Sequence, residues 1–171
     1  MIAIAYLFGA FGIVFNFLIY QQNTRKKLLT VKLIANCFWS VHYGFLGAWS
    51  GAVICAVGVI RETIFLNENK RWAKGKHWLL IFLILSLIGT IFTWKHIFSI
   101  LPAIASALSV FSFWRGSPKL TKILAFPISS CFLIYNITCA SYVGILNEVI
   151  VLSSALIGLL KSKVTSEKQL S

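Results

Sequence analysis

The chain has 171 residues, of which 58% are hydrophobic and 12% are charged, and its mean hydropathy is +0.85. This composition excludes a water-soluble globular domain, which needs far more polar surface at this length. The formal charge of +12 does not indicate a nucleic-acid partner, because the basic residues lie in short segments between apolar stretches. We expect these residues to attract anionic lipid of the inner leaflet instead.

Seven apolar stretches of about 16 to 20 residues divide the chain, and each is about as long as a helix needs to cross a bilayer core. The first stretch has neither a basic residue ahead of it nor a small-residue cleavage site, which are the marks of a signal peptide. We therefore expect it to remain as a helix. In chain order, the expected helices are 2–20, 28–47, 51–66, 78–94, 97–114, 120–138 and 142–160.

The positions of the basic residues predict how these helices are oriented. Fifteen of the sixteen Lys and Arg residues lie in alternate connections or in the C-terminal segment, and the other connections contain only Lys95. Because Lys and Arg near helix ends resist translocation, the positive-inside rule places the basic connections in the cytoplasm. The sequence therefore predicts an all-α polytopic membrane protein with seven transmembrane helices, its N-terminus outside and its C-terminus cytoplasmic.

The first three and the last three helices share one pattern of connections, a basic hairpin followed by a short uncharged turn. A shift of 92 residues also aligns Lys27 with Lys119 and Tyr43 with Tyr135. Since one crossing helix separates the two groups, the repeats are expected to be parallel, in a 3+1+3 arrangement like that of SWEET-type carriers. The single membrane domain then comprises a first repeat, a linker helix, a second repeat and a cytoplasmic tail, at 1–66, 78–94, 97–160 and 161–171.

Two features near the middle of the chain give further expectations. The linker helix is almost purely Leu, Ile and Phe over 79–92, so we expect it to face lipid without any polar lining. Arg61 is expected to extend to lipid phosphate, with a gating role as the alternative. Arg61 and Glu62 are not expected to face each other, because adjacent helical residues point in different directions.

Polar residues inside the stretches carry the functional argument, because they are costly in hydrocarbon and usually face a bundle interior or a water-filled cavity. His42 and Glu148 should share a depth of about 8 to 10 Å below the outer surface, which makes them a candidate proton-coupling or substrate-gating pair. In the alternative interpretation, Glu148 caps the last helix among hydrated headgroups and His42 bonds a neighbouring helix.

A second, neutral set of residues forms stripes on the helices. Asn36 and Tyr43 are seven residues apart and share a face, and Asn16 and Asn36 are expected near each other at the inner mouth. Such stripes serve close helix packing or line a path for a polar solute. Together with the acidic pair, the candidate substrate-binding residues are Asn16, Asn36, His42, Tyr43, Asn136, Asn147 and Glu148.

Other chemistry is poorly represented in the sequence. The four cysteines, Cys37, Cys55, Cys131 and Cys139, lie inside apolar stretches without a CxxC pair, so we expect buried small side chains rather than metal ligands. The chain has no Asp, four acids in all and no recognised catalytic motif. We expect no catalytic residue, no metal and no cofactor.

The segments 21–27 (QQNTRKK), 35–36 (AN) and 42–48 (HYGFLGA), together with Arg61, resemble the YgjV family of bacterial inner-membrane proteins over most of the first half. That family is similar to the PQ-loop and SWEET (MtN3-like) superfamily, which has a Pro-Gln hinge where this chain has Tyr20 and Gln21. The resemblance implies a fold and a location in the bacterial inner membrane. It names no substrate and leaves open whether the chain acts as a monomer or a homodimer.

These observations predict a facilitator or secondary carrier of a small polar solute, with its path between the two three-helix repeats. The alternative is a non-transporting membrane scaffold or partner subunit, in which the polar stripes serve helix packing alone. Access of solvent to the polar stripes distinguishes the two.

Overall fold

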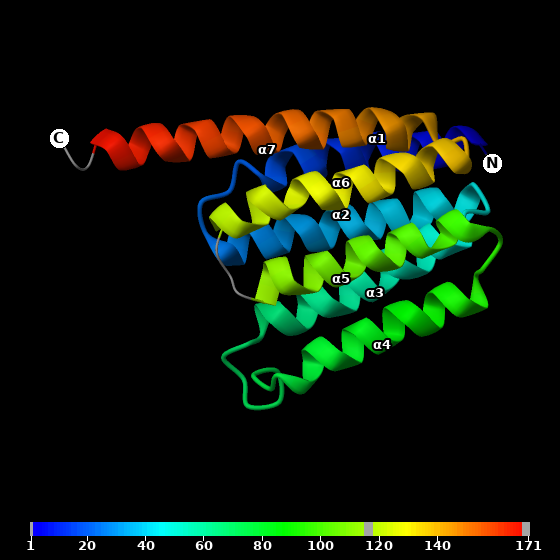
Figure 1. Ribbon diagram of the computed structural model, residues 1–171, viewed down its shortest axis with the longest axis horizontal. Coiled ribbons are helices and arrows are strands. Elements are labelled where there is room, and N and C mark those ends of the chain that lie inside the picture. Colours follow the sequence, from blue (N-terminus) through cyan, green and yellow to red (C-terminus); the bar gives the residue numbers. More distant parts are fainter. Residues whose placement is uncertain (1, 115–117, 169–171) are drawn as a thin grey trace.

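The computed structural model describes the backbone of residues 2–114 and 118–168, and the side chains of these residues up to 160 (Figure 1). Within these ranges the chain forms seven α-helices and one short 3-10 helix, η1. The elements are α1 (Ile2–Ile19), α2 (Arg25–Phe45), α3 (Trp49–Leu66), α4 (His77–Phe92), η1 (Ile97–Ile100), α5 (Leu101–Trp114), α6 (Pro118–Thr138) and α7 (Tyr142–Lys168).

The helix boundaries agree with those expected from the apolar stretches, with one large difference at the end. Pro118 starts α6, where its fixed φ suits the first helical turn. α7 continues to Lys168, past the expected end at residue 160, because residues 161–168 include no Gly or Pro. Arg115, which belongs to one of the basic connections, and residues 169–171 of the predicted tail lie outside the described residues.

Five helical segments are long and apolar enough to cross a membrane: α1, α3, η1 with α5, α6, and α7 up to Leu160. α2 is less apolar because Lys32, Asn36 and His42 interrupt it. α4 is apolar but has 16 residues, or about 24 Å of helix. The chain is therefore an integral membrane protein with several candidate spans.

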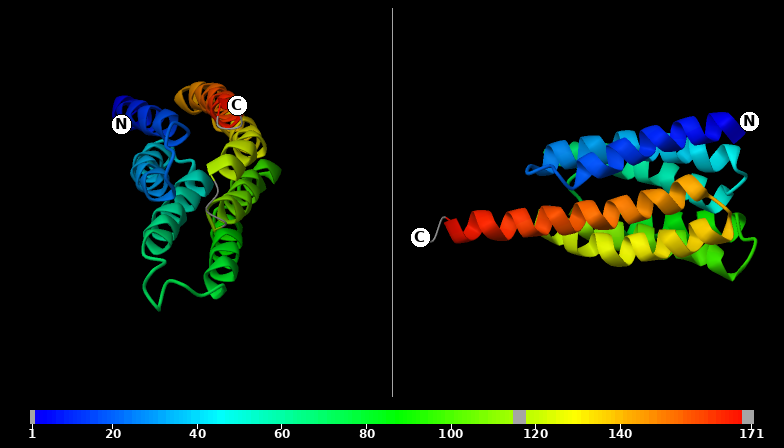
Figure 2. Two further views of the ribbon diagram at one scale, coloured as in Figure 1. Left: turned by 90° about the vertical axis from the view of Figure 1, so that its left-hand side faces the viewer. Right: turned by 90° about the horizontal axis from the view of Figure 1, so that it is seen from above.

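The helices form two rows, which the end-on view of Figure 2 shows side by side. In one row α2 packs between α1 and α3, and in the other the order is α7, α6, α5, α4. The rows meet at both edges, where α1 contacts α7 and where α3 contacts α5 and α4. α2 and α6 occupy the middle of their rows.

The two ends of the bundle are named here by their helix termini. α1, α3, α5 and α7 begin at the end where the N-terminus lies, which we call the N-terminal end (Figure 1). α2, α4 and α6 begin at the opposite end, which we call the C-terminal end.

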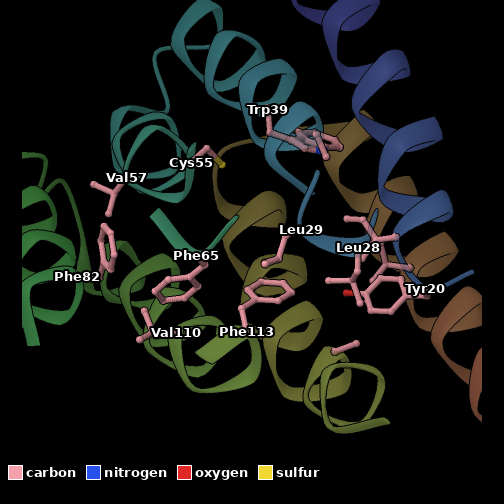
Figure 3. Packing of buried hydrophobic residues seen from close by; sticks show 14 of the residues in the cluster. Tyr20, Leu28, Leu29, Trp39, Cys55, Val57, Phe65, Phe82, Val110 and Phe113 are labelled. Carbon is pink, nitrogen blue, oxygen red and sulfur yellow. The ribbon is translucent and has the colours of Figure 1, made fainter. Parts of the chain in front are cut away.

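Buried aromatic and aliphatic side chains pack between the helices, and Figure 3 shows part of this cluster. Phe65 of α3 lies edge-on to Phe82 of α4 and to Trp114 of α5, with ring centroids 5.8 Å and 5.6 Å away. Large apolar side chains also cover the outer surface, and Phe92 is 86% exposed. An apolar surface this extensive is typical of contact with lipid.

The expectation that α4 has no polar lining was wrong. Leu80 and Phe92 face outward, but Ser86 and Thr90 are buried, and the Ser86 hydroxyl lies 2.8 Å from the Ser106 hydroxyl of α5. The reason is that α4 packs against both α3 and α5. Close contact between membrane helices favours small and hydroxylated residues.

Gly9 provides the first stability test, because α1 approaches α2 and α7 closely there. A Cβ atom at Gly9 would lie 2.6 Å from Val143 Cγ1 and 2.8 Å from His42 Nδ1. We expect Gly9→Ala to lower the free energy of unfolding by about 1 to 3 kcal/mol, as overpacking does elsewhere. Thermal unfolding of the purified protein in detergent measures this.

Gly44→Ala is the matched control, since a Cβ there meets nothing within 4 Å and the residue lies in α2. Its melting temperature should be unchanged or slightly higher, because alanine reduces the entropy of the unfolded chain. Equal melting of the two variants would contradict the close packing at Gly9.

Candidate functional site

A polar cavity of about 50 Å³ lies between the two rows. An ordered water needs roughly 10 to 15 Å³ of such space, so the cavity has room for about three to five water molecules. Side chains from every α-helix except α4 line it. Its polar lining includes Asn16, Lys32, Asn36, Arg61, Ser129 and Glu148.

One side of the cavity is a hydrogen-bonded chain between α1 and α7. Asn16 Nδ2 donates to Asn147 Oδ1 at 2.9 Å, and Asn147 Nδ2 donates to Glu148 Oε1 at 2.8 Å. Ser129 of α6 also hydrogen-bonds the Glu148 carboxylate, which is 5% exposed. The side-chain oxygen of Asn16, Oδ1, has no hydrogen-bond partner among the described residues. Three predicted site residues therefore come together here.

A buried ion pair forms the opposite side. Arg61 Nη2 and Nε donate to Glu62 Oε1 at 2.8 and 3.2 Å, and both residues are almost fully buried. Asn36 Nδ2 donates to Glu62 Oε2 at 3.3 Å, and Arg61 Nη1 donates to the Ser106 carbonyl oxygen at 3.3 Å. The pair thereby connects α2, α3 and α5, and Asn36 lies with Glu62 rather than with Asn16.

The prediction that Arg61 reaches lipid phosphate was therefore wrong. Cα–Cβ bonds of adjacent residues diverge on a helix, but the long arginine stem lets the guanidinium turn back to Glu62. A carboxylate buried at this depth needs a cation beside it, and Arg61 also lies over the Phe113 ring at 5.6 Å. The length of the arginine side chain, rather than the direction of its Cα–Cβ bond, decides this contact.

His42 does not pair with Glu148. Its Nδ1 lies 2.8 Å from the Ala5 carbonyl oxygen and its Nε2 lies 2.9 Å from the Ser141 hydroxyl. Because a carbonyl oxygen only accepts, Nδ1 donates, and a neutral ring accepting from Ser141 satisfies both bonds. The residue thus joins α2 to α1 and to the α6–α7 turn. Glu148 is not a helix cap in hydrated headgroups either, since it is buried in α7.

Two tyrosines join the rows at the N-terminal end. Tyr43 of α2 donates from its hydroxyl to Asn136 Oδ1 of α6 at 2.8 Å. The Gly51 amide of α3 donates to the Tyr135 hydroxyl of α6 at 3.1 Å, and the two tyrosine ring centroids are 6.1 Å apart. With His42, these contacts close the N-terminal side of the cavity.

Sequence reasoning missed Lys32, Trp39 and Cys55, which also line the cavity. Lys32 was counted among the basic connections, yet it lies within α2. It precedes Asn36 by four residues and Tyr43 by eleven, a helical spacing that places all three on one face and could have identified it.

Two other sequence expectations need correction. Lys122, expected in a connection, lies in α6, and its Nζ donates to the Gly158 carbonyl oxygen at 3.1 Å. Cys37 is exposed rather than buried, whereas Cys55 is buried as expected. Cys131 and Cys139 are partly buried.

Comparison with known proteins identifies the family of the chain. The bacterial inner membrane protein family Imp-YgjV matches residues 3–166. The chain belongs to this family. The family resemblance seen in the sequence is thus confirmed, and with it the location in the bacterial inner membrane. No curated protein and no solved structure matches the chain.

In a YgjV-family protein, the polar groups described above lie within helices surrounded by lipid. Polar and ionised groups at such positions are costly, and they usually mark a solute path or an internal network. The cavity is therefore the candidate site, and Arg61 with Glu62 is the part whose energetic role is most readily measured.

We expect Arg61→Met to leave Glu62 buried without its cation and to reduce the free energy of unfolding by about 3 to 5 kcal/mol. The double variant Arg61→Met with Glu62→Gln contains no unpaired charge and should recover most of that loss. Thermal unfolding of both variants in detergent compares them. A single variant that melts like the wild type would show that the pair is not buried as described.

Proposed function

We propose that this YgjV-family protein is a facilitator or secondary carrier of a small polar solute, with its path between the two helix rows. The supporting observation is the cavity itself, which gathers cationic, anionic and amide side chains between helices of an integral membrane protein. Helix packing alone is served by Ser, Gly and amide contacts and does not require charged side chains around an open space. No catalytic residue is proposed.

The proposed orientation has seven crossings, with the C-terminal end of the bundle in the cytoplasm. It is supported by the distribution of exposed basic side chains among the described residues, because Lys95 lies at the N-terminal end and the rest of this set gathers at the C-terminal end. α2 and α4 would cross beside the five longer apolar segments. The exposed basic residues at the C-terminal end are Lys26, Lys27, Lys70, Arg71, Lys74, Lys76 and Lys119. They would contact anionic lipid of the inner leaflet.

We further propose that α1–α3 and α5–α7 are parallel repeats related by a two-fold axis along the membrane normal. Such an axis exchanges α1 with α5, α2 with α6 and α3 with α7, and it converts the contact of α1 with α7 into that of α5 with α3. Tyr43 and Tyr135, which are 92 residues apart, both make hydrogen bonds between the rows. This resembles the organisation of SWEET-type carriers.

The cavity geometry supports entry from the cytoplasmic side. The contacts of His42, Tyr43 and Tyr135 close the N-terminal side, whereas Lys32 lines the cavity nearer the C-terminal end and is partly exposed. Release to the other side would require the tyrosine contacts to separate. Movement of one repeat against the other around a fixed central site is the usual way to achieve this.

Native Cys55 provides a direct test of access. In a background with Cys37, Cys131 and Cys139 replaced by serine, a small membrane-impermeant thiol reagent should label Cys55 in inside-out vesicles, because solute reaches the cavity from the cytoplasm. Labelling in right-side-out vesicles should be much weaker. Mass spectrometry of the purified protein measures both.

The matched control places the sole cysteine at Ala105, which is fully buried and does not line the cavity. This Ala105→Cys protein, which also has Cys55→Ser, should remain unlabelled from either side. If Cys55 is protected from both sides to the same degree, the carrier proposal fails and a non-transporting scaffold or partner subunit is favoured.

A further inference from the structure

We propose that the solute held in the cavity is a small zwitterion of the size of glycine or alanine. This inference rests on the proposed carrier function and specifies its substrate class. It depends on which charged groups of the cavity already have partners and which do not.

Two opposite charges face the cavity from different rows without contacting each other. Lys32 lies on α2 and Glu148 on α7, and both line the space. No ion pair joins them, and the Lys32 ammonium has no hydrogen-bond partner in the described part of the chain. A carboxylate as buried as that of Glu148 is costly unless a cation pairs with it, whereas Lys32 is partly exposed. A ligand that binds both groups at once removes this cost.

The other two charges near the cavity are already satisfied. Arg61 donates to Glu62 and Ser106, and Glu62 accepts from Arg61 and Asn36. Their charges cancel within a closed ion pair. The charge available to a ligand is therefore one cation and one anion, and their sum is zero.

The groups that surround these two charges divide in the same way. Beside Glu148 on the α1–α7 side is the unpaired side-chain oxygen of Asn16, which is 6% exposed, and both groups can accept from an ammonium. On the α2 side, the Lys32 ammonium is a donor that lines the cavity. The carboxylate of a ligand would bind such a donor, and it binds an ammonium more strongly than an uncharged N–H group. The site thus has an acceptor pole and a donor pole.

This polarity excludes simpler solutes. A simple anion would be repelled by Glu148, a simple cation would be repelled by Lys32, and a neutral amide would leave both charges unpaired. The cavity has room for about three to five water molecules, which favours a solute with as few heavy atoms as glycine over a sugar or an amino acid with a large side chain. An α-amino acid with a minimal side chain satisfies both poles and the size.

Uptake by the full-length protein in lipid vesicles tests the inference. Radiolabelled glycine should enter vesicles that contain the protein, and unlabelled alanine should compete with it. Acetate, methylammonium and acetamide each lack at least one pole and should not compete at equal concentration. Competition by any of these as strong as that by alanine would overturn the zwitterion assignment.

Charge-removing variants identify the two poles. Lys32→Gln and Glu148→Gln should each reduce glycine uptake at least about tenfold, since one lost charge-assisted contact corresponds to roughly 1.4 kcal/mol or more. Lys27→Gln, on the exposed surface of α2, and Glu68→Gln, outside the cavity, are the matched controls and should transport like the wild type. Wild-type uptake by either pole variant would overturn the assignment.

The results also separate this inference from the carrier proposal. If acetate or acetamide is transported and glycine is not, the substrate class is wrong but the carrier function stands. If no solute is transported and Cys55 is protected from both sides, both proposals fail. Should a pole variant fail to purify as a folded protein, the wild-type competition series alone decides the question.

Discussion

Polar groups enclosed by hydrocarbon must find their partners inside the protein, and this constraint holds the two helix rows together. Apolar faces give little net attraction between helices that are surrounded by lipid. The rows are instead connected by specific contacts, from Asn16 to Asn147 at one edge and from Arg61 to Ser106 at the other. Tyr43 and Asn136 add a central contact at the N-terminal end.

The same constraint locates the functional site, because the polar groups are not satisfied equally. At the N-terminal end the rows are joined directly, because His42 and the two tyrosines have hydrogen-bond partners there. Farther along the bundle, Lys32 and Glu148 face a space that is large enough for several water molecules. Closed contacts at one end and incompletely paired charges in the middle are what a carrier needs to bind a solute and later release it.

The sequence predicted the seven helices well because the length and position of an apolar stretch are properties of the chain alone. It predicted the polar contacts less well, because these depend on how each helix is rotated and how far each side chain reaches. His42 and Glu148 were matched by expected depth, yet each bonds different neighbours. Arg61 was assigned by the direction of its Cα–Cβ bond, and its long stem reaches Glu62 instead. Asn16, Asn147 and Glu148 were each predicted to face the bundle interior, because polar residues on apolar helices turn away from lipid. Their hydrogen bonds to one another were not predicted.

Whether the space between the rows holds water is measured most directly by hydroxyl-radical footprinting of the protein in its native membrane. Radicals generated from water beside a side chain oxidise it, so Trp39 and Tyr43 should be modified although each is at most 3% exposed. Exposed Trp72 should also react, whereas Phe82, which is fully buried among aromatic rings away from the cavity, should not. Oxidation of Trp72 with Trp39 and Tyr43 unmodified would contradict a hydrated cavity and leave a dry, packed seam between the two rows.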